Sequence, residues 1–199
     1  MRKASLLVLL LGLFVSAHTM HAQQLDGAFG VFTVTAPSNA TLTSTSFTPQ
    51  SIGGGAFPGF SADYLFKNHL GVQGEVAWRA KQNIYGGYQP FRPILYDFNA
   101  MYAPYFGKKV EAEVLAGFGG QSARFYNATY NCSFTGCTDY SSSNHLMGHI
   151  GGGIRLYVYN RFFVRPEAHV YFVRNNFEFN SSHEERVGVS IGYSFGTEE

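Results

Sequence analysis

Apolar and polar residues alternate one by one along much of this chain. The clearest case is the segment 72–81, where Val72, Val76 and Trp78 occupy one set of alternate positions and Glu75 and Arg79 the other. Successive side chains of a β-strand point to opposite faces. The segment therefore predicts a strand with one apolar face and one charged face.

The same alternation recurs elsewhere, and beyond the N-terminal segment we find no convincing helical period. The further predicted strands are 25–34, 57–66, 94–105, 110–118, 149–158, 164–172 and 186–195. The sequence thus predicts an all-β fold of about eight strands.

The connections between these segments alternate in length. Short turns are expected at 67–69, 107–109 and 160–161, and longer polar loops at 35–55, 82–92, 126–144 and 180–185. Short turns at one end and long loops at the other are typical of outer-membrane barrels, whose long loops face out of the cell. We therefore predict a closed antiparallel transmembrane β-barrel with both termini at the short-turn, periplasmic end.

A soluble β-sandwich is the main alternative, since it also alternates apolar and polar residues. Two features weigh against it. The polar faces carry charges of both signs although only 14% of the residues are charged. Aromatic residues also lie near strand ends on the apolar faces, as expected for the two interfacial girdles of a barrel; they are Phe66, Trp78, Tyr102, Tyr105, Phe162, Tyr193 and Phe195.

Pro166 lies in the middle of a predicted strand, where it removes a hydrogen-bond donor. A closed barrel has no free edge on which to place it, so we expect a local bulge or an internal water there.

Bulk composition agrees with a barrel. The mean hydropathy of −0.07 argues against several helical spans, and the formal net charge of +1 gives no basic face for nucleic acid.

The N-terminus has the features of an export signal. Arg2 and Lys3 precede the apolar run 4–15, which is too short for a spanning helix of about 20 residues. We predict a signal peptide at 1–22, with cleavage after residue 17 as an alternative, and a barrel domain at 23–199. In the oxidising compartment that follows, Cys132 and Cys137 are expected to form a loop disulfide rather than a metal pair.

The architecture resembles the small outer-membrane barrel families typified by the membrane domain of OmpA, OmpX and OmpW. The resemblance covers nearly the whole mature chain, and no motif selects one family. It implies that the last strand, with Gly188, Ile191, Tyr193 and Phe195, is recognised by the barrel assembly machinery. This chain departs from the pattern because residues 196–199 follow the final Phe.

If the apolar faces meet lipid, the charged side chains of the strands collect in the lumen. An eight-stranded lumen is only wide enough for side chains to fill, so these charges should pair and plug it. A narrow pore gated by exchange of partners is the alternative. The expected network comprises Asp63, Glu75, Arg79, Asp97, Glu111, Glu113, Arg155, Arg165, Glu167 and Arg186.

Catalytic motifs are not evident. His145 and His149 have the spacing of two zinc ligands on a helix, but on a strand they would lie about 13 Å apart, too far to share a metal. Ser141, Ser142 and Ser143 near His145 are expected to be a polar loop end. We therefore expect no enzyme and no cofactor or metal.

The sequence favours a structural or passive outer-membrane barrel, largely plugged and monomeric. A narrow porin for small solutes or ions is one alternative, and a surface adhesin acting through its extracellular loops is another. The expected partners are outer-membrane lipid, the assembly machinery and an unidentified loop partner, without nucleic acid.

Overall fold

The computed structural model describes residues 24–36, 51–66, 69–107, 109–133, 136–176, 178–179, 181 and 183–195. The predicted signal peptide and its cleavage sites lie outside these residues, as do most of the predicted loop 35–55 and the residues after Phe195. Within the described part, no helix has the length and apolar character needed to cross a membrane.

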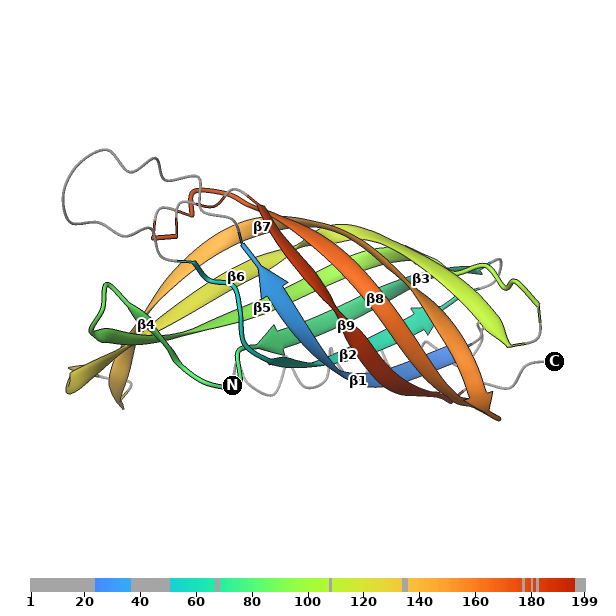
Figure 1. Ribbon diagram of the computed structural model, residues 1–199, viewed down its shortest axis with the longest axis horizontal. Coiled ribbons are helices and arrows are strands. Elements are labelled where there is room, and N and C mark those ends of the chain that lie inside the picture. Colours follow the sequence, from blue (N-terminus) through green and yellow to red (C-terminus); the bar gives the residue numbers. More distant parts are fainter. Residues whose placement is uncertain are drawn as a thin grey trace, which may run out of the picture.

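Eight long strands form a closed, up-and-down antiparallel barrel (Figure 1). Each long strand pairs with its neighbour in the chain, and β9 returns to pair with β1, which closes the barrel. The short β4 lies outside the barrel and pairs only with β5, which itself pairs with β3. The strands are β1 (Gln24–Thr35), β2 (Phe57–Leu65), β3 (Leu70–Trp78), β4 (Asn83–Tyr85), β5 (Gln89–Tyr102), β6 (Val110–Ser133), β7 (Gly136–Tyr159), β8 (Phe162–Val173) and β9 (His183–Ser194). The predicted all-β closed barrel is confirmed.

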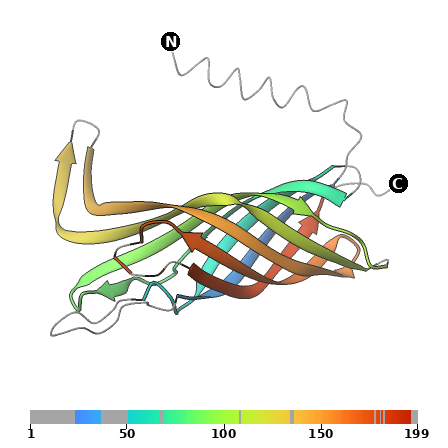
Figure 2. The same ribbon diagram turned by 90° about the horizontal axis from the view of Figure 1, so that it is seen from above.

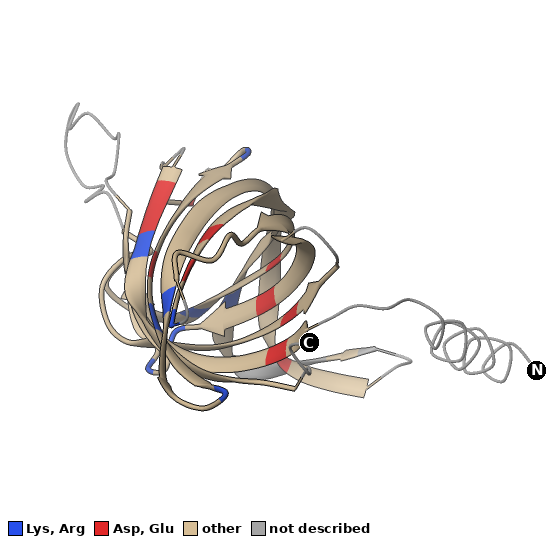
Figure 3. Cartoon of the chain, turned by 90° about the vertical axis from the view of Figure 1, so that its right-hand side faces the viewer, with Lys and Arg blue, Asp and Glu red and all other residues tan. Residues whose placement is uncertain are grey.

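The outer face of the barrel is apolar and the inner face is polar. Large side chains such as Phe29 (46% exposed), Phe98 (53%) and Phe118 (65%) point outward, whereas acidic and basic side chains between them are buried. Figure 3 looks along the barrel and shows charged positions on strands around its wall. This inverts the arrangement of a soluble protein, and so large an apolar exterior is stable only against lipid or another apolar surface.

The two ends of the barrel differ as predicted. Short turns join β2 to β3, β5 to β6 and β7 to β8, and left-handed backbone conformations at His69, Gly107 and Asn160 form them. The Phe195 N–H donates to the Leu25 carbonyl at 2.7 Å. Both ends of the described barrel therefore lie together at the short-turn end, and the long connections lie at the opposite end.

The predicted loop 126–144 is wrong, because this segment continues the hairpin of β6 and β7. Both strands have 24 residues, against 12 in β8 and β9. Pairing runs to Tyr126–Tyr140, shifts register, and ends at Ser133–Gly136. The extension bends away from the barrel (Figure 2, yellow to orange). Alternation appears only where one face is buried, so a ribbon exposed on both faces gave no strand signal.

Two other predicted loops are also shorter than expected. The segment 82–92 contains β4 and the start of β5, and β9 begins at His183 within the predicted loop 180–185.

Pro166 is accommodated as a gap in one ladder. It lies opposite Val189 of β9, but pairing with β7 is interrupted between Gly153–Glu167 and Leu156–Val164 without a change of register. The nearest register shift, between Tyr157 and Tyr159, lies closer to the turn. The missing N–H thus costs ladder pairing on one side of β8 rather than a bulge at the proline.

The disulfide between Cys132 and Cys137 joins paired positions near the tip of the β6–β7 extension. A two-stranded ribbon without a packed face is marginally stable in water, so the covalent link should hold this ribbon but not the barrel. We predict that a Cys132→Ser/Cys137→Ser variant folds with an unchanged urea midpoint but is cleaved faster by protease within 126–144. Loss of the heat-modifiable barrel band on a gel would contradict this separation.

Candidate functional site: the charged barrel interior

Glycines at inward positions of β7 make room for the large side chains inside the barrel. Gly151 and Gly153 alternate with the outward Ile150 and Ile154. A Cβ atom on Gly153 would lie 3.2 Å from both Arg165 Cγ and Glu113 Oε1, and one on Gly151 would collide with His169. Only a residue without a side chain leaves enough space here.

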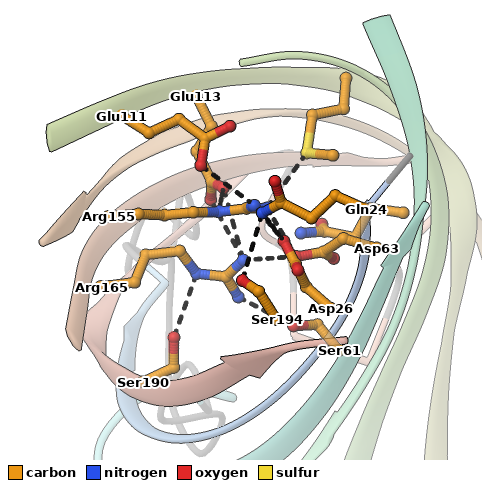
Figure 4. Close-up of polar contacts among 12 residues, drawn as sticks. Gln24, Asp26, Ser61, Asp63, Glu111, Glu113, Arg155, Arg165, Ser190 and Ser194 are labelled. Atoms are coloured by element: carbon orange, nitrogen blue, oxygen red, sulfur yellow. Dashed lines mark hydrogen bonds and ion pairs between the residues drawn. The ribbon is translucent and has the colours of Figure 1, made fainter. Parts of the chain in front are cut away.

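Arg155 of β7 is the centre of the interior and is fully buried. Its Nε donates to Glu113 Oε2 at 2.8 Å, and its Nη2 donates to Asp63 Oδ2 at 2.7 Å. Its Nη1 pairs with Asp26 and lies 3.4 Å from Glu111 Oε2. One guanidinium group therefore binds carboxylates from β1, β2 and β6 (Figure 4).

Arg165 of β8 lies beside Arg155 and shares two of its partners. Its Nη1 lies 3.0 Å from Asp63 Oδ2 and 3.3 Å from Glu113 Oε1. The two shared carboxylates screen the repulsion between the guanidinium groups. The remaining donors of Arg165 reach Ser61 Oγ at 2.8 Å and Ser190 Oγ at 3.1 Å.

A third guanidinium, Arg186 of β9, lies toward the loop end. It pairs with Glu75 of β3. Its Cζ atom lies 4.1 Å from the centroid of the Phe32 ring and 5.6 Å from that of Tyr171. Arg186 is therefore held by one carboxylate and two aromatic faces, a favourable arrangement where water is excluded.

A histidine pair completes this level of the interior. His149 of β7 lies 2.7 Å from His169 of β8 between the ring nitrogens, and the rings stack with centroids 4.9 Å apart. The Tyr171 ring stacks on His149 at 4.7 Å. Asn99 of β5 and Glu167 of β8 bind the outer nitrogens of the pair.

Apolar clusters lie on either side of the charged interior. Toward the short-turn end, Leu65, Met101, Ala103 and Leu115 pack together. At the loop end a larger cluster includes side chains from the connections, and there Phe179 lies 5.1 Å from Phe91 between ring centroids. Burial, with the nearby Glu178 carboxylate, raises the pKa of the Tyr85 hydroxyl beside it. The other members at the loop end are Phe32, Val34, Ala36, Ile52, Phe57, Ala77, Leu95, Ala123, Phe125, Met147, Tyr171 and Val173.

Most residues of the sequence-predicted network face this interior. Nine of the ten are buried, namely Asp63, Glu75, Asp97, Glu111, Glu113, Arg155, Arg165, Glu167 and Arg186. Arg79 is the exception and must be corrected, because β3 ends at Trp78 and Arg79 turns toward the loop, where it binds the Gly53 carbonyl at 3.4 Å. Arg79 is in phase with the inward residues of β3, but the strand ends one residue before it.

Four buried acidic or histidine side chains were missing from the predicted network. Asp26 lies on β1, whose inward residues from Ala28 onward are small or apolar, so no charged face was visible. Glu184 fell in a predicted loop. His149 and His169 were recognised on polar faces, but no sequence signal showed that adjacent strands bring them into contact.

The residues of the predicted assembly signal lie along β9 and just after it. Ile191 and Phe195 point outward, each 62% exposed. Tyr193 packs between Phe162 and Phe195, with both centroid distances 4.8 Å. Gly188 faces inward, where a Cβ atom would collide with the Phe32 ring.

One cluster of described residues has ligand atoms close enough for a metal. Glu75, Glu167 and His169 each offer an atom within 4.8 Å of the others. Arg186 pairs with Glu75, and Arg165 lies 3.3 Å from Glu167. Two guanidinium groups already occupy the carboxylates and would repel a cation, so we do not assign a metal site.

A serine, a histidine and a glutamate meet at the rim of the loop end. Ser143 Oγ and Glu178 Oε2 lie 3.1 and 3.0 Å from the same atom, His145 Nε2, and Ser143 also donates to Glu178. A catalytic triad needs the carboxylate on the opposite ring nitrogen, so that Nε2 is free to take the serine proton. These contacts instead fasten the connection after β8 to β7.

Removing the central guanidinium should destabilise the barrel strongly. We predict that Arg155→Ala lowers the free energy of unfolding by about 3–5 kcal/mol, because Asp26, Asp63 and Glu113 lose a buried partner. Arg79→Ala, the matched change outside the network, should alter it by less than about 1 kcal/mol. Urea unfolding of the refolded proteins measures both, and equal effects would refute a central role for Arg155.

Comparisons with known proteins find similarity in structure only. No family model matches the sequence, and no curated protein matches it.

Several solved outer-membrane barrels have the same fold. The attachment invasion locus protein Ail of Yersinia pestis, in complex with the heparin analogue sucrose octasulfate, is 14% identical, with a TM-score of 0.58 over 86% of this chain and 98% of that one. Neisserial surface protein A is 10% identical, with a TM-score of 0.58 over 86% and 96%. The N-terminal β-barrel domain of Pseudomonas aeruginosa OprF is 15% identical, with a TM-score of 0.53 over 85% and 97%. The chain therefore has the fold of the small eight-stranded outer-membrane barrels.

Proposed function

We propose that this protein resides in the outer membrane of a Gram-negative-type bacterium and acts there as a closed, structural barrel. Its apolar exterior matches the lipid-facing surface of such barrels, and the solved structures that share its fold are outer-membrane proteins. The short-turn end would face the periplasm and the long connections the outside.

The burial of the three guanidinium groups carries the proposal of a closed lumen. Arg155, Arg165 and Arg186 have exposed fractions of 0%, 1% and 0%. A side chain that borders a water-filled channel has surface that water can reach, and these have almost none. Charge pairs fill the middle of the barrel and apolar clusters lie on either side of it, so the structure favours a plug over a pore.

Biogenesis follows the route implied by the sequence. The segment 1–22 would direct export, and the outward residues of β9 would be recognised by the barrel assembly machinery. With all strands paired in the closed barrel, no strand edge within the lipid demands a second copy, and we propose a monomer.

Conductance in a planar bilayer tests the closed lumen. We predict that the refolded wild-type protein gives no discrete current steps. An Arg155→Ala/Arg165→Ala variant leaves Asp63 and Glu113 unpaired beside the vacated volume but keeps the apolar clusters on either side, so it should also give no steps. Reproducible steps from wild-type protein would instead establish the narrow-porin alternative. A heat-modifiable band on a gel confirms that each sample is folded.

The long β6–β7 extension favours one second role, that of an adhesin. It carries the chain well beyond the barrel, with Tyr126 and Tyr140 in contact across its strands at 6.1 Å between ring centroids. Tyrosine and serine supply adaptable contacts to proteins. Arg124 is the only Lys or Arg in 124–146, so a protein partner suits this ribbon better than a polyanion such as the ligand of the Ail complex.

Shortening the ribbon in register tests the adhesin role. Replacing 127–139 by Asn-Gly closes the hairpin at the Tyr126–Tyr140 pair with a favoured two-residue turn. We expect this variant to fold like wild type but to abolish adhesion of protein-bearing liposomes to cultured cells. The Cys132→Ser/Cys137→Ser variant keeps the residues of the ribbon but not its disulfide, so it shows whether adhesion needs the covalently closed ribbon. Undiminished adhesion of the shortened variant would exclude the ribbon as the adhesive element.

A further inference from the structure

A line of hydrogen-bonded side chains crosses the barrel interior from β5 to β8. Its members are Asn99, His149, His169 and Glu167, none more than 5% exposed. The His149 Nδ1 atom lies 2.6 Å from Asn99 Oδ1, and the His149 Nε2 atom lies 2.7 Å from His169 Nδ1. The His169 Nε2 atom lies 3.1 Å from Glu167 Oε2. Three contacts of hydrogen-bond length thus join four side chains.

The orientation of the Asn99 amide determines which nitrogen of His149 carries a hydrogen. Its nitrogen donates to Asp97 Oδ1 at 2.5 Å and to Gln73 Oε1 at 3.3 Å, both of which are acceptors. The Asn99 oxygen therefore faces His149 and accepts. His149 must carry a hydrogen on Nδ1.

The other hydrogens can then be counted. Each contact needs one hydrogen between its heavy atoms, because two bare lone pairs repel at these distances. Two neutral imidazoles supply two hydrogens, one on His149 Nδ1 and one on His169 Nδ1. None is then left between His169 Nε2 and the ionised carboxylate of Glu167. We infer that the line is a buried proton-binding site, which takes up one additional proton and holds it between His169 and Glu167.

Charges of both signs face this line. Glu75 from β3 and Asp97 from β5 favour the uptake, whereas Arg165 from β8 and Arg186 from β9 oppose it; the hydroxyl-bearing Tyr171 ring of β8 packs on His149. The described buried side chains include eight carboxylates but only three guanidinium groups. An added proton therefore reduces an excess of buried negative charge that water does not solvate. The carboxylates belong to Asp26, Asp63, Glu75, Asp97, Glu111, Glu113, Glu167 and Glu184.

The two rings can hold one additional proton without losing their hydrogen bond. A second on the rings would place hydrogens on both His149 Nε2 and His169 Nδ1, two donors facing each other across the contact of 2.7 Å. The hydrogen bond between the rings would be lost. Holding the proton thus maintains the contact between His169 and Glu167, and the space left by Gly151 accommodates the histidine pair.

The substitution Glu167→Gln removes the need for the additional proton and changes no other residue. The glutamine amide supplies a covalently attached hydrogen toward His169 Nε2, so the variant needs no additional proton. Between pH 7.5 and 9 the unfolded chain has neutral histidines and ionised glutamates. If the folded wild type holds the proton, its folding equilibrium constant falls as pH rises, by about tenfold per pH unit more steeply than that of the variant. Urea titrations across this range measure the slopes.

Glu185→Gln, an exposed change on β9, should keep the wild-type slope. Equal slopes for wild type and Glu167→Gln would overturn the inference.

Nuclear magnetic resonance of wild-type protein labelled at histidine nitrogens and glutamate carboxyl carbons gives an independent count, which serves even if Glu167→Gln does not fold. We expect at pH 7 a nitrogen–nitrogen coupling across the His149–His169 hydrogen bond and a third hydrogen on either His169 Nε2 or Glu167. Two neutral rings beside an ionised Glu167 would overturn the inference. Neither outcome depends on whether the barrel conducts ions.

Discussion

The need to solvate buried guanidinium groups without water governs the interior of this barrel. An ionised side chain taken out of water is stable only when other charges and hydrogen bonds replace its hydration. Arg155 obtains that replacement from carboxylates on three strands, and Arg165 shares two of those carboxylates. Because each carboxylate must reach the same point, the network fixes the register of β1, β2, β6, β7 and β8 around one centre.

This constraint explains residues that make no polar contact themselves. Gly153 has no side chain because Arg165 and Glu113 fill its place, and Gly151 yields its place to the histidine pair. On the outside, the same strands carry residues such as Ile150 and Ile154, which need only be apolar. Geometry and charge thus determine which residues occupy the inner face of a strand, and the surrounding medium determines which residues occupy the outer face. Alternation along the sequence records both requirements at once.

Where one face of a strand is apolar and the other charged, the sequence was enough to predict the element. The barrel, its short turns and nine inward charges follow from that contrast. The β6–β7 extension could not be predicted in this way, because both of its faces are exposed to water and show no such contrast. Asp26 was missed because small residues such as Ala28 and Gly30 occupy the inner face of β1 beside it. Pairings between strands, including the contact of His149 with His169, depend on register, which no single strand encodes.

The composition of the interior bears on what the protein can do. A plug built only for stability would be expected to balance its charges, since every unpaired carboxylate costs free energy. Here the described interior contains more acid than base, and Glu184 forms none of the ion pairs found among the described residues. Protons are the simplest counter-charges for that excess, because they need neither a cavity nor a ligand shell. On the proposed closed lumen, a barrel sealed to solutes would therefore still exchange protons with its surroundings, and its stability should depend on their concentration.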